Sequence, residues 1–217
     1  MDVDKIISKI RNGDFKDVKR FIKKNPDKVN RKNSDGLTLL MAACERGNKE
    51  LITLLTKSGA DLNIGDEDKW TALHYAVENH KTDVVAFLVS RGANVNKQDS
   101  CGDTPLHWAV MNKYEDVVKV LLNSKENNNL QVNQQNNEGQ TALYYACYFG
   151  QINIVELLLQ QNGIDVNAVE NKGWTALHVA CEHGQTNIVE LLLQQNGIDV
   201  NKVNIEGDTP LHRAVLK

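Results

Sequence analysis

The chain repeats itself with a period of about 34 residues, and this periodicity limits the possible folds more than any other feature. Residues 150–167 and 184–201 differ at a single position and start 34 residues apart. A second motif, TLLMAA in its first copy and TPLHRA in its last, occurs six times and starts at Thr38, Thr71, Thr104, Thr141, Thr175 and Thr209. Units of this length cannot bury an apolar face alone, so they must stack on one another.

Each unit has the pattern of a turn, a helix, a second turn and a second helix. The threonine stands where a helix N-cap is favoured, and proline follows it at the first helical position in two copies. Leucine two residues later, alanine five later and valine or cysteine six later form one apolar helical stripe. A second apolar segment, such as 153–161, ends at a glycine that suits a left-handed C-terminal residue. Glycine shortly before the next threonine indicates a tight turn with positive φ.

These motifs resemble the ankyrin repeat, whose pattern is T-P-L-H-x-A-A followed by G-x-x-x-I-V-x-L-L-L and G-A-D-V-N. The resemblance covers almost the whole chain. It implies an all-α solenoid of stacked helix-turn-helix units joined by β-hairpin-like turns. Residues 1–33 are expected to form an N-terminal capping repeat, and 34–204 five full repeats. Their expected bounds are 34–66, 67–99, 100–136, 137–170 and 171–204.

The last unit, 205–217, is expected to be an incomplete repeat, because it stops inside its first helix. Solenoids normally end in a polar capping repeat, so the pattern indicates either a fragment of a longer protein or a frayed end.

Charge is unevenly distributed along the chain. Residues 1–32 carry a net +6 and residues 33–217 a net −9, which together give −3. The basic N-terminal segment can attract an acidic partner, although a solvated outer face is the simpler interpretation. The acidic remainder argues against nucleic acid as the main ligand.

The sequence has no apolar stretch of about 18 residues and no signal-peptide pattern. We therefore expect no membrane insertion and an intracellular, cytoplasmic protein, with the nucleus or export into a host cell left open.

No pattern of catalytic or metal-binding residues is present in the sequence. The helical position three residues after threonine holds histidine in four units, but it also holds Met41 and Tyr144, which excludes a set of metal ligands. In ankyrin repeats this histidine is structural, and the resemblance implies the same role for His74, His107, His178 and His212. There is no nucleophile elbow, P-loop or HExxH motif. We expect no enzymatic activity, no cofactor and no metal.

The cysteines and asparagines also follow the repeat. Three cysteines alternate with valine in the core stripe, which predicts that they are small core residues: Cys44, Cys147 and Cys181. Cys101 falls at a turn tip and is expected to be exposed, either as a contacting thiol or as a neutral surface replacement. Asn63, Asn96, Asn167 and Asn201 are similar to ankyrin asparagines that the hypoxia-factor asparaginyl hydroxylase modifies. The same asparagine is structural in most ankyrin repeats.

Aromatic residues concentrate at four positions of each unit, which lie one residue before the threonine and four, seven and eight residues after it. In ankyrin proteins these positions line a concave groove that contacts partners. They account for 24 of the 217 residues but hold seven of the twelve aromatic residues. We predict a partner-binding surface made of Trp70, Tyr75, Trp108, Met111, Tyr145, Tyr148, Phe149 and Trp174. The alternative is that these rings only cover neighbouring repeats. Tyr144 falls in the histidine position and is expected to pack near the turn, away from this surface.

The sequence therefore predicts a non-catalytic, monomeric adaptor or scaffold that binds another protein on its groove. Trp108, Tyr145 and Tyr148 are expected to be central anchors, with Trp108→Ala weakening binding by about 2 kcal/mol while the fold survives. The ligand is expected to be apolar in the middle with basic residues at its edge.

Two alternatives remain. The chain is the recognition domain of a larger protein with an enzymatic or channel domain elsewhere, or it is a structural stack that binds through its turn tips or the inserted loop at 124–129.

Overall fold

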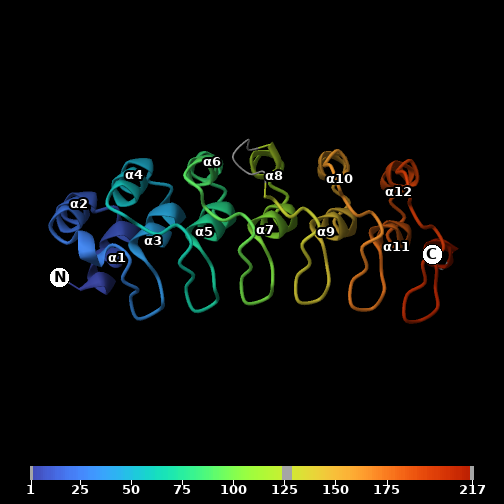
Figure 1. Ribbon diagram of the computed structural model, residues 1–217, viewed down its shortest axis with the longest axis horizontal. Coiled ribbons are helices and arrows are strands. Elements are labelled where there is room, and N and C mark those ends of the chain that lie inside the picture. Colours follow the sequence, from blue (N-terminus) through green and yellow to red (C-terminus); the bar gives the residue numbers. More distant parts are fainter. Residues whose placement is uncertain (1, 124–128, 216–217) are drawn as a thin grey trace.

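The computed structural model describes residues 2–123 and 129–215, and within these ranges every regular element is helical. Two rows of helices run along the molecule (Figure 1). The inner row contains α1 (Val3–Asn12), α3 (Leu39–Arg46), α5 (Ala72–Glu78), α7 (Pro105–Met111), α9 (Ala142–Tyr148), α11 (Ala176–Glu182) and α13 (Pro210–Val215). The outer row contains α2 (Phe15–Lys24), α4 (Lys49–Lys57), α6 (Thr82–Ser90), α8 (Glu115–Asn123), α10 (Ile152–Leu159) and α12 (Thr186–Leu193). A 3-10 turn, η1 (Pro26–Lys28), follows α2. This arrangement confirms the predicted all-α solenoid.

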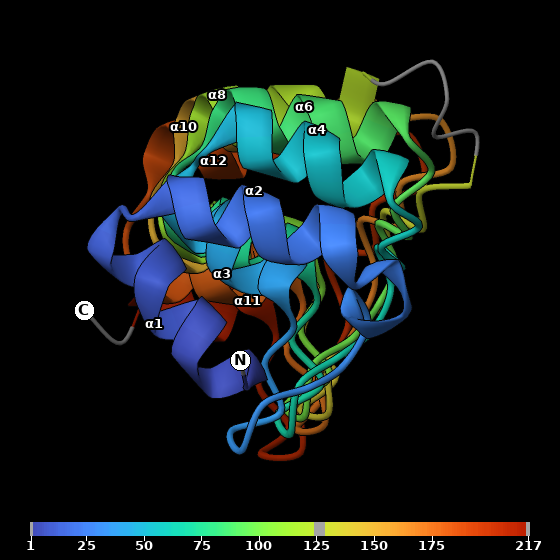
Figure 2. The ribbon, with the colours of Figure 1, turned by 90° about the vertical axis from the view of Figure 1, so that its left-hand side faces the viewer.

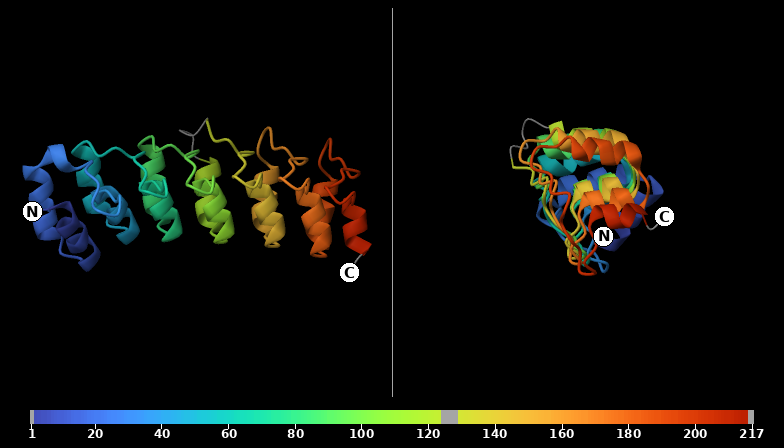
Figure 3. Two further views of the ribbon diagram at one scale, coloured as in Figure 1. Left: turned by 90° about the horizontal axis from the view of Figure 1, so that it is seen from below. Right: turned by 90° about the vertical axis from the view of Figure 1, so that its right-hand side faces the viewer.

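Hairpin-like turns form a third layer beside the inner helices. Each turn is closed by a backbone hydrogen bond, such as the one from Asp99 N to the Asp103 carbonyl at 3.0 Å. Successive turns are also joined, since Ser100 N donates to the Asp68 carbonyl of the preceding turn at 2.8 Å. Viewed along the stack, the outer helices, inner helices and turns of successive units lie behind one another (Figure 2). The two termini lie at opposite ends (Figure 3).

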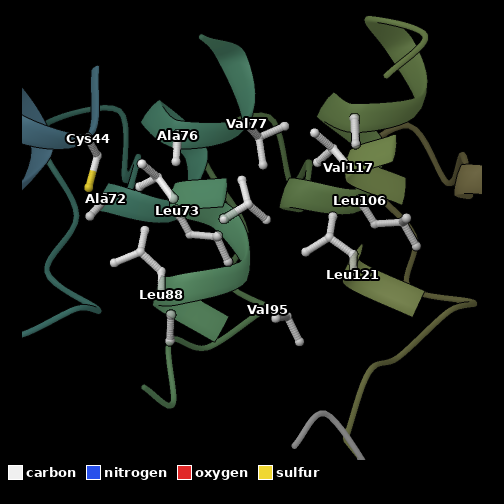
Figure 4. Packing of buried hydrophobic residues seen from close by; sticks show 14 of the residues in the cluster. Cys44, Ala72, Leu73, Ala76, Val77, Leu88, Val95, Leu106, Val117 and Leu121 are labelled. Atoms are coloured by element: carbon white, nitrogen blue, oxygen red, sulfur yellow. The ribbon is translucent and has the colours of Figure 1, made fainter. Parts of the chain in front are cut away.

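The core runs through the whole stack between neighbouring units. Five of the six alanines of the predicted stripe, Ala43, Ala76, Ala109, Ala146 and Ala180, are fully buried, whereas Ala214 of the last unit is exposed. Because alanine is small, α3 can pack closely on α5, α5 on α7 and so on along the row. Larger residues from both rows fill the space around them, as Leu73, Leu88, Leu106 and Leu121 do in Figure 4.

Helix starts and turns follow the predicted pattern. Thr38, Thr104, Thr141 and Thr175 cap their helices by accepting a hydrogen bond from the backbone N–H three residues on. Gly102 adopts φ 82°, and a Cβ at this residue would lie 2.6 Å from the backbone nitrogen of Asn137. Lys69 occupies the equivalent place in the preceding turn with φ 63°, a conformation that is unfavourable for a residue with a side chain.

The C-terminal end differs from the regular pattern. Leu211 stands where Leu177 stands in the preceding unit, yet Leu211 is 70% exposed and Leu177 is 2% exposed. The described residues place no further unit against α13, so the apolar stripe of this helix is uncovered. Cys181, predicted to lie in the core, is only half-buried. On the side of the next unit, the short α13 is the only described helix that packs against α11. Cys44 and Cys147 are buried and Cys101 is exposed, as predicted.

Three of the four predicted asparagines, Asn63, Asn96 and Asn167, link their unit to the next. Asn63 Oδ1 accepts the backbone N–H of Asn94 at 2.8 Å. Asn167 Oδ1 accepts from Asp199 N at 2.8 Å, and its Nδ2 donates to the Gly197 carbonyl at 2.7 Å. These bonds give the asparagines a structural role, and their hydroxylation stays a prediction. Of the inserted loop at 124–129, residues 124–128 lie outside the described residues.

Candidate partner-binding site

Aromatic side chains of consecutive units meet beside the inner helices. The rings of Trp70 and Trp108 lie edge to face with centroids 4.6 Å apart, and Tyr75 lies 5.5 Å from Trp70. Trp70 precedes α5, Tyr75 lies on α5 and Trp108 lies on α7. We call these three half-buried residues the first ring cluster. The structure thus brings together three predicted site residues from two neighbouring units.

Two of these rings, Tyr75 and Trp108, are hydrogen-bonded through their polar ends to the hairpin turns. Tyr75 Oη donates to Asp66 at 2.6 Å, and Trp108 Nε1 donates to Asp99 at 2.8 Å. The other carboxylate oxygen of each aspartate accepts two backbone N–H groups of its own turn. Each ring is therefore fixed to the turn that it covers. Trp108, which the sequence marks as a binding anchor, also stabilises its own repeat.

A second ring cluster, Tyr145, Tyr148 and Phe149, lies on and just after α9. Tyr145 and Phe149 are stacked with centroids 6.2 Å apart, and Tyr148 lies perpendicular to Phe149 at 5.1 Å. Tyr148 also contacts His183 of the next unit, with centroids 5.0 Å apart. Tyr148 is 46% and Phe149 37% exposed. This cluster is therefore more open to solvent than the first. Met111, at the end of α7, is half-buried.

Histidines at the third helical position connect neighbouring units. His74 Nδ1 accepts the backbone N–H of Thr71 at 3.1 Å, and its Nε2 lies 3.4 Å from the Asp103 carbonyl of the next unit. His107 and His178 repeat this arrangement. Burial lowers the pKa of His74 and of His107 to about 4 and keeps both rings neutral. The described residues contain no group of three His, Cys, Asp or Glu side chains placed to hold a metal ion.

Tyr144 interrupts this series, and a solvent-open hollow of about 490 Å³ lies beside it. The structure shows no hydrogen bond from the Tyr144 side chain to the next unit, among the bonds between described residues. Instead the half-buried ring lines the hollow together with Tyr148 and Trp174. Tyr144 therefore lies near the turn, as predicted, but next to two residues of the predicted surface rather than apart from them. A phenol replaces the imidazole that would bind the neighbouring turn, and its ring faces the hollow between the two units.

Carboxylates outnumber cations around this hollow. Glu138, Glu170, Glu182 and Glu206 line it, together with Lys172 and His183. Glu170 is 9% exposed, and its Oε1 accepts the backbone N–H groups of Lys172 and Trp174 at 2.8 and 3.0 Å. Burial, with a further contribution from the charge of Glu170, raises the pKa of the Tyr144 hydroxyl to about 12. The hollow therefore combines aromatic walls with negative charge.

Trp174 belongs to neither ring cluster, and a cation covers its ring. The Arg213 guanidinium carbon lies 4.6 Å above the Trp174 ring centroid. Arg213 also forms ion pairs with Glu206 and, at 2.9 Å, with Asp208. Arg213 occupies the same repeat position as Trp108, and Trp174 the same position as Trp70. A guanidinium here covers the tryptophan that a second ring covers in the first cluster.

A buried carboxyl group lies between the two ring clusters. Asp103 is 6% exposed, and its Oδ1 accepts a hydrogen bond from Asn136 Nδ2 at 2.9 Å. The same nitrogen donates to Tyr145 Oη at 3.1 Å. Burial raises the pKa of Asp103 to about 6; the bond from Asn136 opposes this shift, and the nearby charge of Asp99 adds to it.

The sequence also matches a known family over nearly its whole length. The model of ankyrin repeats in three copies matches residues 6–99, 92–170 and 162–217. The chain belongs to the ankyrin-repeat family. No curated protein gives a significant match to the sequence. No helix in the described ranges is both long enough and apolar enough to span a membrane.

A solved ankyrin-repeat domain has a similar fold. The crystal structure of the ankyrin repeat domain of Bcl-3, a member of the IkappaB protein family, superposes with a TM-score of 0.84 at 26% sequence identity. The similarity covers 96% of this chain and 92% of that domain. The helix pairs and turns of this ankyrin-repeat protein are therefore arranged as in an experimentally determined ankyrin-repeat structure.

The residues that sequence reasoning missed are those that depend on two units at once. Glu138 and Glu206 occupy the same turn-tip position two units apart, and Tyr144 belongs to a different position again. A comparison of the units at one repeat position at a time does not group these residues, because the glutamates and Tyr144 occupy different repeat positions. One sequence feature could have indicated the hollow. Tyr144 stands where four other units have histidine, and the unit that follows has acidic residues at several positions.

Proposed function

We propose that this ankyrin-repeat protein binds another protein on its aromatic face, which comprises the two ring clusters and the hollow beside Tyr144, and that it performs no chemistry of its own. The observation that carries the proposal is the exposure of Tyr148 and Phe149 beside a hollow lined by further rings. Large exposed aromatic groups are uncommon unless they are used.

Burial of these rings by a partner would supply binding energy. Removing apolar surface from water is worth about 25 cal/mol per Å². The ring contacts within the second cluster hold Phe149 against Tyr145 and Tyr148, so little conformational freedom is lost when a partner docks. Tyrosine and tryptophan are also the residues most often found at the centre of interfaces.

The family supports this use of the surface. Ankyrin repeats are protein-interaction modules, and the similar Bcl-3 domain belongs to the IkappaB protein family. Repeat scaffolds present different side chains on one architecture, so the partner is set by the surface residues of this chain. The first place to look for the partner contact is therefore the exposed second cluster.

The proposal is tested by affinity capture from the source cells with quantitative mass spectrometry. The double variant Tyr148→Ala/Phe149→Ala is compared with the wild type and with Leu193→Ala. Leu193 is 49% exposed on α12, which matches the 46% exposure of Tyr148. We expect the double variant to lose captured partners by more than about tenfold, corresponding to at least about 1.4 kcal/mol, while Leu193→Ala retains them.

Circular dichroism of the three proteins checks that the variants remain folded. An identical set of partners for the wild type and the double variant would contradict the proposed surface. Loss of the same partners with Leu193→Ala would contradict it as well, because that residue lies on the outer row.

A further inference from the structure

We propose that the hollow beside Tyr144 binds the side chain of an arginine, presented by an extended basic segment of the partner protein. The inference rests on the proposed function. It names the chemical group that the hollow in the aromatic face recognises. Three features carry it: the shape and lining of the hollow, its unpaired negative charge, and an arginine of the chain itself that already binds to one of its walls.

The lining suits a flat, apolar-faced group. Tyr144, Tyr148 and Trp174 contribute rings from two neighbouring units to a space of about 490 Å³. Ligand-binding clefts typically measure about 300–1,000 Å³, so the hollow has room for one long side chain and some water. Arginine carries an aliphatic stem and a planar head that stacks on aromatic rings.

The charge in the hollow calls for a cation. Among the described residues, the structure shows no hydrogen-bond or ion-pair partner for the side chains of Glu138 and Glu182. Glu170, although nine-tenths buried, has one carboxylate oxygen bound by the turn and no partner shown for the other. An apolar side chain would remove these carboxylates from water without replacing their hydrogen bonds, at a cost in free energy. An anionic ligand would be repelled.

Arg213 shows how this surface binds a guanidinium. Its head lies over Trp174, which also lines the hollow, and it pairs with Glu206, another lining residue. A tryptophan face together with a carboxylate therefore already holds one arginine. The hollow offers the same two components again, as the rings of Tyr144 and Tyr148 together with Glu138 and Glu182. Arginine fits this combination better than lysine, because its guanidinium is less strongly hydrated and binds carboxylates through two parallel N–H groups.

The test is a titration with a short peptide followed by NMR of the full chain. The probe has arginine at its centre, two glycines on each side and blocked ends. Two matched peptides carry citrulline, which is uncharged and of similar shape, or lysine. The indole N–H signals of the three tryptophans report where the probe binds. We expect the Trp174 signal to shift saturably at millimolar peptide, while the Trp70 and Trp108 signals stay in place.

The charge requirement is tested on both partners. Citrulline in the probe, or Glu138→Gln/Glu182→Gln in the protein, is expected to weaken binding about fivefold, the scale of one lost cation–π contact or partly exposed ion pair. The control pair Glu156→Gln/Glu190→Gln makes the same change in net charge on the outer helices α10 and α12, where both residues are exposed. It is expected to leave the affinity unchanged.

No shift at Trp174, equal binding of the citrulline peptide, or an equal effect of the control pair would overturn the inference. Equal binding of the lysine peptide would overturn the assignment to arginine. The proposed function fails separately. If Tyr148→Ala/Phe149→Ala loses its captured partners while the arginine peptide does not bind, the protein-binding surface stands and the arginine site is rejected. If the peptide binds at Trp174 while Tyr148→Ala/Phe149→Ala still captures the same partners, the arginine site stands and the proposed protein-binding surface is rejected.

Discussion

Both ring clusters are built from the four aromatic positions of the repeat, but they share only the one held by Tyr75, Trp108 and Tyr145, and their rings have different surroundings. In the first, Trp108 covers Trp70, and Trp108 and Tyr75 are each hydrogen-bonded to an aspartate of their turn. In the second, Tyr148 and Phe149 have exposed faces, and the tryptophan that follows them, Trp174, is covered by Arg213. The difference shows that an aromatic residue at one of these predicted binding positions can either be fixed to its turn or remain exposed on the surface.

The largest difference between the clusters is expected in stability. Trp108→Ala removes the ring that covers Trp70 and leaves Asp99 without its indole donor, so the free energy of unfolding should fall by about 3 kcal/mol. Tyr148→Ala, at an exposed ring, should change it by less than about 1 kcal/mol. Urea unfolding followed by circular dichroism measures both. Equal losses would show that the two rings have the same role.

The carboxyl group between the clusters should make stability depend on pH. The pKa of Asp103 is raised from 3.8 to about 6 in the folded chain, so the folded state holds its proton more tightly than the unfolded state. Its contribution is present below about pH 4 and is lost as the pH rises through about 6. Asp103→Asn should therefore stabilise the protein at pH 7 by up to about 2 kcal/mol.

Unfolding free energies of the wild type and Asp103→Asn at several pH values between 4 and 7 check this expectation. The difference between the two proteins should shrink as the pH falls. A constant difference across the range would mean that folding does not raise the pKa of Asp103. Asp165→Asn, at an exposed site, is a matched control for the loss of one carboxylate.

Restoring the histidine at Tyr144 should make the second region resemble the first. Tyr144→His supplies an acceptor for Thr141 N and a donor for the carbonyl of Trp174, the bonds that His107 makes in the preceding unit. We expect the unfolding free energy to rise by about 1 kcal/mol and the arginine peptide to bind more weakly. Tyr144→Phe, which adds no such bond, is the control. A stabilisation by both variants would point to the loss of the hydroxyl as the cause.

The smallest effect is expected at the turns that precede the two tryptophans. Lys69 has φ 63° before Trp70, whereas Gly173 has φ 79° before Trp174. Lys69→Gly relieves a left-handed conformation, partly offset by the flexibility of glycine in the unfolded chain, and should stabilise by about 0.5 kcal/mol. Gly173→Ala should destabilise, since a Cβ would lie 3.0 Å from Asn204 Cα. Thermal unfolding of both variants tests the signs.

The sequence by itself determined the fold of each unit. Threonine caps, the alanine stripe and the turn glycines act within a few residues of one another, so their pattern specifies the helix pair and its turn wherever it occurs. The period of the repeat then requires the units to stack. The aromatic positions could be selected in the same way, because they follow from the register of one helix.

The tertiary structure decided what each of these positions does. The ring of Tyr144 lines the hollow with Trp174, which lies 30 residues further on, and Trp174 in turn is covered by Arg213 from a third segment. Leu211 repeats the core position of Leu177 but is exposed, because no described unit covers it. A local pattern fixes the direction of a side chain, whereas its burial and charge environment depend on the residues that the neighbouring unit places against it.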